Sequence, residues 1–151
     1  MELSAKSVRV ELPASTHYLV LVRQFISSLA NHIGFSKADV AKIELALDEA
    51  CSNSIRAIRR IEGESPVTHL LLDVEYDCRS IAITVYDNGR DFSRNLQSET
   101  PLQDLIASMK TSGYGLQIIK TCMDEVIYNH VPERGNLLRL VKYIEPTPHT
   151  T

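Results

Sequence analysis

The sequence predicts an α+β domain, a two-layer sandwich whose helices cover one face of a mixed, mostly antiparallel sheet. Segments typical of strands occur mainly as consecutive pairs, and segments of helical periodicity are inserted between them. The chain has 151 residues, which is enough for one hydrophobic core. We therefore expect a single domain over residues 1–145, followed by a disordered tail at residues 146–151.

The first part of the chain predicts one strand and two helices. Residues 8–12 alternate apolar and polar side chains, which is typical of a short strand. Apolar residues at helical spacing predict a helix over residues 15–32, and Gly34 is suited to end it. Ser36, with Asp39 three positions later, resembles a capping box and opens a second helix. Helical spacing predicts its buried stripe, which consists of Val40, Ile43, Leu47, Ala50, Ser54 and Ile58.

Two strands and a long loop follow. Residues 67–76 are rich in Leu and Val, and residues 81–85 alternate, so both predict strands joined by a turn at residues 77–80. Residues 87–112 show little periodicity, although residues 102–109 could form one short helix. A loop of this length in a compact domain is usually functional or mobile.

The last part of the chain predicts a helix and two further strands. The helix covers residues 113–123, and the strands cover residues 126–131 and 137–144, with a turn between them. The resulting order, β-α-α-β-β-loop-α-β-β, differs from the regular alternation of a doubly wound sheet.

Composition excludes several classes of protein. The net charge of -3 does not suggest a general nucleic-acid-binding protein. One basic cluster lies near a predicted helix end, where cations are favoured in any case, so we interpret it as a solvated helix face. Its members are Arg56, Arg59 and Arg60.

Three well-separated cysteines support neither a disulfide framework nor a zinc site, and they fit a reducing compartment. They are Cys51, Cys78 and Cys122. No apolar run approaches the ~20 residues of a membrane helix, and the N-terminus has no signal-like core. We therefore expect a cytoplasmic protein with no membrane partner.

Three local features could carry chemistry. Glu49 and Asn53 lie four residues apart on the second predicted helix and so share a face, where a carboxylate and an amide oxygen suit a base and Mg²⁺. Asp87 and Gly89 follow a strand, where a carboxylate could accept a hydrogen bond from an adenine amino group. Taken alone, each is more often an ordinary polar helix face or an ordinary turn.

The third feature is a pair of glycines before a predicted helix. Gly113 and Gly115 expose backbone N–H groups at a helix start, which is a suitable place for phosphate, although a simple hinge and cap would look the same. No P-loop, no G-x-G-x-x-G motif and no nucleophile elbow is present.

The order of these features resembles that of the GHKL ATPases over about residues 6–144. Within that superfamily, residues 45–55 (LALDEACSNSI) and residues 112–126 (SGYGLQIIKTCMDEV) resemble motifs of the RsbW-type anti-sigma-factor serine kinases. The resemblance implies the GHKL (Bergerat) fold, with ATP and Mg²⁺ as cofactors.

The resemblance also implies a role for each matching residue. Glu49 matches the general base, Asn53 the Mg²⁺ ligand and Asp87 the acceptor for adenine. Residues 90–111 match the lid over the nucleotide. Further nucleotide-binding positions are Gly89, Lys110, Gly113, Tyr114, Gly115 and Leu116.

Several positions depart from the family pattern. Asp91 stands where a third glycine is usual, and Lys110 and Thr111 stand where an arginine is often found. Lysine offers a point charge rather than a bidentate fork. Asn136 stands where a threonine near the adenine is usual, and Ala57 replaces a common histidine.

The leading hypothesis is a serine/threonine protein kinase that uses Mg-ATP to phosphorylate an anti-sigma-factor antagonist of the STAS type. A sigma factor or another regulator would be the sequestered partner, and a homodimer is expected through the amphipathic first helix. Phosphoryl transfer needs mainly positioning and charge neutralisation, which few polar residues can supply. The alternatives are a non-catalytic nucleotide-sensing module and the detached catalytic domain of a histidine kinase. Partner-binding residues are not readable, and Arg23 is only a candidate.

Overall fold

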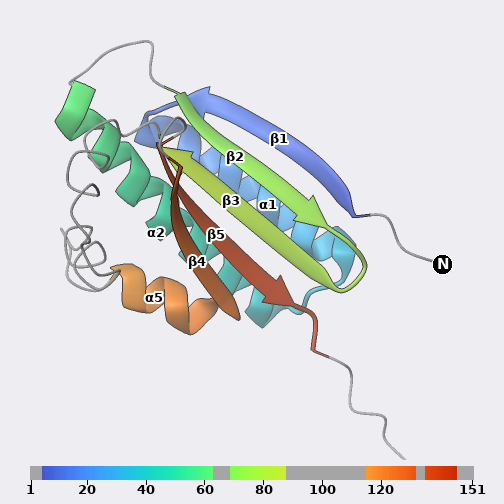
Figure 1. The fold of residues 1–151 in the computed structure, drawn as a ribbon. Coiled ribbons are helices and arrows are strands. Elements are labelled where there is room, and N and C mark those ends of the chain that lie inside the picture. The colour runs from blue at the N-terminus through green and yellow to red at the C-terminus, as the bar shows by residue number, and fades with distance from the viewer. Residues whose placement is uncertain (1–4, 63–68, 88–114, 132–134, 146–151) are drawn as a thin grey trace, which may run out of the picture.

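The computed structural model describes residues 5–62, 69–87, 115–131 and 135–145. Within them the chain forms five strands, one 3-10 turn and three helices (Figure 1). In chain order these are β1 (Lys6–Pro13), η1 (Thr16–Tyr18), α1 (Leu19–Ile33), α2 (Lys37–Glu62), β2 (His69–Tyr76), β3 (Ser80–Asp87), α5 (Gly115–Cys122), β4 (Glu125–Val131) and β5 (Gly135–Tyr143). The α+β class predicted from the sequence is confirmed.

The strands form one open sheet in the order β1-β2-β3-β5-β4. Every pairing among the described strands is antiparallel, so the parallel component expected for a mixed sheet is not found there. The insertion of α5 and β4 before β5 lets β5 return beside β3, and β4 becomes the edge strand opposite β1. This order brings the end of β3 beside the start of β5.

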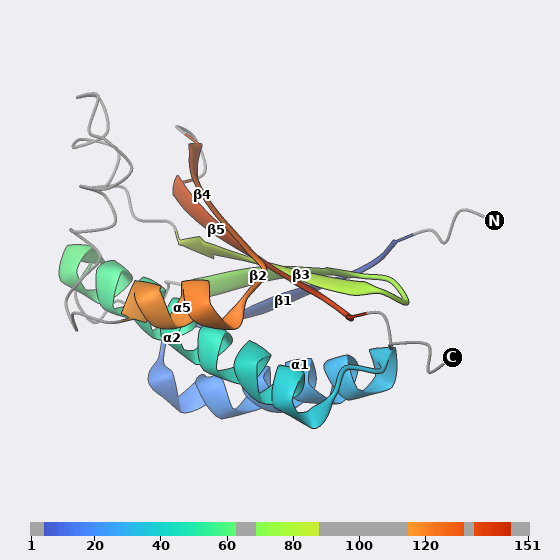
Figure 2. The same ribbon diagram turned by 90° about the horizontal axis from the view of Figure 1, so that it is seen from below.

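All three helices lie on the same side of the sheet, which gives the two-layer sandwich expected from the sequence (Figure 2). Alternate residues of the central strands point into the space between the layers, as the period of two requires. Leu72, Val74, Ile83 and Leu140 are fully buried there. The stripe predicted for the second helix is also buried, and it consists of Val40, Ile43, Leu47, Ala50, Ser54 and Ile58.

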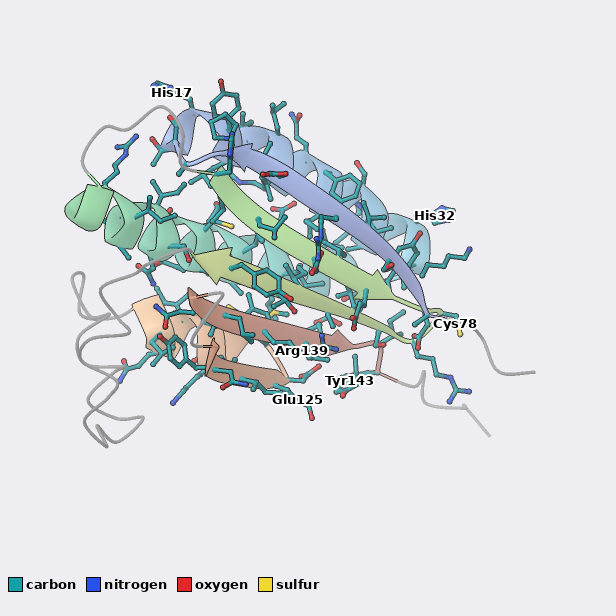
Figure 3. All side chains as sticks on the ribbon, turned by 45° about the horizontal axis from the view of Figure 1, so that its top comes forward. His17, His32, Cys78, Glu125, Arg139 and Tyr143 are labelled. Carbon is teal, nitrogen blue, oxygen red and sulfur yellow. The ribbon has the colours of Figure 1, made fainter. Side chains whose placement is uncertain are left out.

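The outer face of the sheet carries paired charges. Arg9 on β1 contacts both carboxylate oxygens of Asp73 on β2, at 2.7 and 3.0 Å. Arg139 on β5 contacts Glu75 at 2.9 Å. Arg139 lies near the labelled side chains of β4 and the end of β5 in Figure 3. These pairs suit a face exposed to water.

The helix ends follow the predicted capping signals. The hydroxyl of Ser36 accepts a hydrogen bond from the backbone N–H of Asp39 at 3.1 Å, as expected at a helix N-cap. Gly34 ends α1 with φ 111° and ψ 19°, a left-handed conformation that favours glycine. The chain can therefore reverse within a few residues, and α2 packs against α1.

The nearly buried ammonium of Lys142 links two segments at the end of β5. Its Nζ lies 3.4 Å from Asp124, just before β4, and 3.9 Å from Asp39 in the first turn of α2. Two carboxylates compensate for much of the cost of removing this charge from water. Lys142 therefore fixes the start of α2 relative to the sheet. None of the described helices combines the length and apolar character required to cross a bilayer.

Candidate nucleotide site

Helix α2 carries both Glu49 and Asn53 on one flank. Each side chain is half-buried, beside the stripe that α2 turns into the core. Figures 1 and 2 show α2 between α1 on one side and α5 on the other. Consecutive residues point about 100° apart around a helix, so neighbours in the sequence can face different sides of α2, one toward α1 and the other away from it.

The acidic pair Asp48 and Glu49 is divided between these two sides. Asp48 faces α1, where the guanidinium of Arg23 holds both of its oxygens at 3.1 and 2.9 Å. Glu49 follows about 100° further around the helix and so lies away from that pair. Arg23, a candidate for partner binding in the sequence, is thus engaged within the domain.

A second polar contact reinforces the α1–α2 packing. Ser27 donates a short hydrogen bond to Glu44, one turn before Asp48. The side of α2 that faces α1 is therefore structural. Of the three acidic side chains Glu44, Asp48 and Glu49, Glu49 makes no ion pair or hydrogen bond within the part of the chain that the structure describes. This fits a side chain available to a substrate.

The amide oxygen of Asn53 faces a cation. The guanidinium of Arg56 donates a hydrogen bond to Asn53 Oδ1 at 2.5 Å. An amide NH₂ cannot accept such a bond, so the contact fixes which amide atom points toward Arg56. The sequence analysis assigned Arg56 to a solvated helix face, and the structure shows that it also contacts the proposed metal ligand.

Cys51 lies between Glu49 and Asn53 in the chain but not in space. Its side chain is fully buried in the core, and burial raises the pKa of the thiol to about 12. A thiolate is the reactive form of cysteine, so Cys51 has no role as a nucleophile near neutral pH. All three cysteines are free thiols.

Asp87 and Asn136 stand opposite each other where β3 and β5 meet. The position of Asp87 in the alternation of β3 is that of Ile83 and Val85, both buried between the layers. The side chain of Asn136 is 2% exposed. The sequence left the role of Asn136 open because the pairing register of two distant strands is not readable from a single strand.

Two of the predicted phosphate-binding positions are described. Gly115 begins α5 and is buried, and Leu116 is half-buried beside it. Helix α5 packs along α2, on the opposite side from α1 (Figure 1). The structure thus places the start of α5 and the Glu49 flank of α2 in the helical layer, and β3 lies in the sheet that this layer covers.

The remaining predicted positions lie outside the described residues. They are Gly89, Lys110, Gly113, Tyr114 and the residues 90–111 expected to form a lid. The side chain of Asp87 is likewise not described, although its backbone is.

The donor set fits magnesium bound together with a nucleotide. No group of three or more His, Cys, Asp or Glu that could hold a metal is found among the described residues. Mg²⁺ at phosphate sites typically needs only one or two protein oxygens, since phosphates and water supply the others. Asn53 Oδ1, already directed toward a cation, is such an oxygen.

Comparison with known proteins agrees with this arrangement. The family model for the histidine kinase-like ATPase domain matches residues 12–142. The chain belongs to this ATPase domain family. The family match extends from β1 to β5 and includes every element that carries a candidate site residue.

Two curated relatives of this chain are named serine-protein kinase RsbW. The serine-protein kinase RsbW of Bacillus cereus strain AH820 is 29% identical over 145 residues, which cover 93% of this chain and 86% of that protein. RsbW of Bacillus thuringiensis strain Al Hakam is 28% identical over 145 residues, which again cover 93% of this chain and 86% of that protein. The resemblance to the RsbW-type kinases is thus confirmed.

Two solved structures share the fold. The RsbU and RsbW domains of a Mycobacterium tuberculosis protein superpose with a TM-score of 0.63 at 15% identity, and the match covers 97% of this chain but 35% of that one. The SiaB–SiaC complex from Pseudomonas aeruginosa gives a TM-score of 0.60 at 14% identity, over 89% of this chain and 88% of the other. At these identities the likeness supports the fold.

Proposed function

We propose that the protein is an ATP-dependent serine/threonine protein kinase that phosphorylates an anti-sigma-factor antagonist of the STAS type in a partner-switching system. The supporting observation is the division of the acidic pair on α2. Arg23 engages Asp48, whereas Glu49 shares its flank of the helix with Asn53. Relatives named serine-protein kinase RsbW support the same class of reaction.

In this proposal each residue of the site has one task. Asp87 accepts a hydrogen bond from the adenine amino group, and the backbone at Gly113 and Gly115 receives the phosphates. Asn53 holds Mg²⁺, which neutralises charge on the phosphates. Glu49 orients the substrate hydroxyl and takes its proton.

The transfer itself balances without a further reactant. The hydroxyl oxygen of the antagonist forms a bond to the γ-phosphorus, and the bond from that phosphorus to the bridging oxygen of ADP breaks. The proton of the hydroxyl moves to Glu49, and ADP leaves with the electron pair of the broken bond. A carboxylate within hydrogen-bond reach of the hydroxyl is sufficient for this step.

The direct test is to incubate the protein with labelled ATP and the antagonist protein encoded nearby, with the Glu49→Gln variant as the control. We expect one phosphorylated Ser or Thr on the antagonist, detected by mass spectrometry. Nucleotide binding without any transfer to the antagonist would contradict the kinase.

A non-catalytic nucleotide-sensing module is the second candidate. Asp91 in place of a glycine and the missing arginine before Gly113 favour it, as does the Arg56 contact at the proposed metal ligand. Retention of the antagonist with ATP, with ADP and without nucleotide separates the two. A kinase releases the antagonist after it gains a phosphate charge of about -1.5 to -2. Equal retention in all three conditions, without phosphate on the antagonist, would favour the binding module.

We further propose a cytoplasmic homodimer in which α1 contributes to the interface. Large apolar side chains are exposed on or next to α1: Tyr18, Val20, Leu21 and Phe25. Tyr18, Leu21 and Phe25 follow helical spacing and form one stripe on the side of the helix away from Asp48. Exposed apolar surface of this kind marks interaction sites more often than isolated exposed residues do.

A further inference from the structure

Arg56 contacts the atom that is proposed to bind magnesium. Its guanidinium donates to Asn53 Oδ1 at 2.5 Å, and its position three residues along α2 places it one turn away. Asn53 is half-buried, whereas Arg56 is exposed. The guanidinium therefore approaches the amide oxygen from the solvent side.

A cation and a metal ion cannot use the same lone pairs of Asn53 at full strength. An amide oxygen offers two acceptor positions, and Mg²⁺ demands close, nearly octahedral oxygen contacts at about 2.0–2.1 Å. A positive guanidinium in hydrogen-bond contact with that oxygen also repels a divalent cation. Metal binding at Asn53 therefore requires Arg56 to move.

We propose that Arg56 is a resident cation that Mg²⁺ displaces from Asn53 when the magnesium–nucleotide complex binds. Without magnesium, the guanidinium stays on this flank and supplies positive charge to the nucleotide phosphates in place of the metal. This inference rests on the proposed function, because it requires ATP or ADP on this flank of α2. It adds a binding residue to the site and predicts how the affinity for nucleotide depends on magnesium.

The chemistry of arginine suits both positions. The guanidinium carries five N–H donors in a rigid plane and stays charged at all relevant pH values, so it can engage an amide oxygen or two phosphate oxygens. The long side chain of an exposed residue changes rotamer at little cost. Without magnesium, Arg56 also supplies part of the positive charge that the phosphates need.

Two effects of opposite sign follow for Arg56→Gln. Without magnesium, the variant lacks the resident cation, so ADP binds more weakly, by about three- to tenfold, the range for one hydrogen bond. With magnesium, the competitor at Asn53 is absent and the metal binds at lower concentration. The ratio of ADP affinity with magnesium to affinity in EDTA therefore rises above that of the unchanged protein.

The experiment is calorimetric titration of the full chain with ADP, in EDTA and at several magnesium concentrations. Arg59→Gln is the matched control, because Arg59 is an exposed arginine on the same helix and, among the described residues, the hydrogen bond to Asn53 Oδ1 comes from Arg56. The magnesium ratio is the ADP affinity with magnesium divided by the ADP affinity in EDTA. We expect the magnesium ratio of Arg59→Gln to stay within about twofold of that of the unchanged protein. Arg56→Lys keeps the charge but lacks the planar fork, and we expect an intermediate ratio.

The outcomes distinguish this inference from the proposed function. Equal magnesium ratios for Arg56→Gln and Arg59→Gln, with ADP still bound, would overturn the exchange and leave nucleotide binding intact. A loss of affinity by the same factor with and without magnesium would show a general charge effect and would also overturn it. Failure of the unchanged protein to bind ADP or ATP in any condition would overturn both. Circular dichroism verifies that each variant is folded.

Discussion

Arg23 on α1 holds both carboxylate oxygens of Asp48 on α2, at 3.1 and 2.9 Å. This fork joins the helix with the exposed apolar stripe to the helix that carries the proposed catalytic residues. It also removes Asp48, the sequence neighbour of Glu49, from consideration as an available base. A bidentate arginine contact fixes a carboxylate in direction as well as in charge.

The first prediction compares the two neighbours. Glu49→Gln should retain nucleotide binding but transfer phosphate to the antagonist about 10²-fold more slowly or worse, the usual scale for loss of a general base. Asp48→Asn should keep the transfer rate within a few fold and should lower the free energy of unfolding by about 1 kcal/mol or less, since the pair is partly exposed. Single-turnover phosphorylation and urea unfolding measure the two effects. If Asp48→Asn proves the slower kinase, the assignment of the base is wrong.

The second prediction concerns the proposed adenine contact at the end of β3. Asp87→Asn replaces an acceptor by a carboxamide whose NH₂ group is mismatched to the adenine amino group, so we expect ADP affinity to fall about tenfold or more. Asp77→Asn, in the hairpin at the other end of the same strand, is the control and should bind ADP normally. Calorimetry decides, and unchanged affinity in Asp87→Asn would exclude this residue from the adenine site.

A third prediction tests the α1 surface. Leu21→Glu places a charge in the stripe shared with Tyr18 and Phe25, and we expect the dimer to dissociate to monomers. Leu45→Glu is the control, because Leu45 is similarly exposed but belongs to α2. Sedimentation analysis at several protein concentrations measures the oligomeric state. A dimer unaffected by Leu21→Glu, or a monomeric unchanged protein, would contradict this interface.

The fourth prediction concerns acid stability. The hydrogen bond from Arg9 holds the pKa of Asp73 below its ordinary value of 3.8. Because the pKa is lower in the folded state, the contribution of Asp73 to stability is present above pH 3.8 and is lost as the pH falls through the folded value. Asp73→Asn should therefore destabilise the protein at pH 7, and the difference from the unchanged protein should shrink below about pH 4.

Urea unfolding between pH 7 and pH 3 measures this dependence. Glu11→Gln is a suitable control, since Glu11 lies on the same strand as Arg9 and is far more exposed than Asp73. A difference between Asp73→Asn and the unchanged protein that stays constant down to pH 3 would show that the Arg9 contact contributes no pH-dependent stability.

Local patterns predicted most elements of the fold. The capping signal at Ser36 and the glycine at position 34 predicted where the helices meet, because caps act through neighbouring backbone groups. The apolar stripe of α2 was also predicted in full, because helical period alone selects the residues that face the core. The lid and Gly113, one of the two predicted phosphate-binding glycines, lie outside the described residues and remain predictions.

The sequence by itself determined the class of fold, the family resemblance and the shared helix face of Glu49 and Asn53. The tertiary structure decided which of Asp48 and Glu49 is available, because that depends on Arg23 from another helix. It also decided that Asn136 stands opposite Asp87, because strand register is set by pairing between segments about 50 residues apart. The contact of Arg56 with Asn53 was compatible with their spacing, but three residues on a helix allow a contact without requiring it, and the structure shows the two side chains directed toward each other.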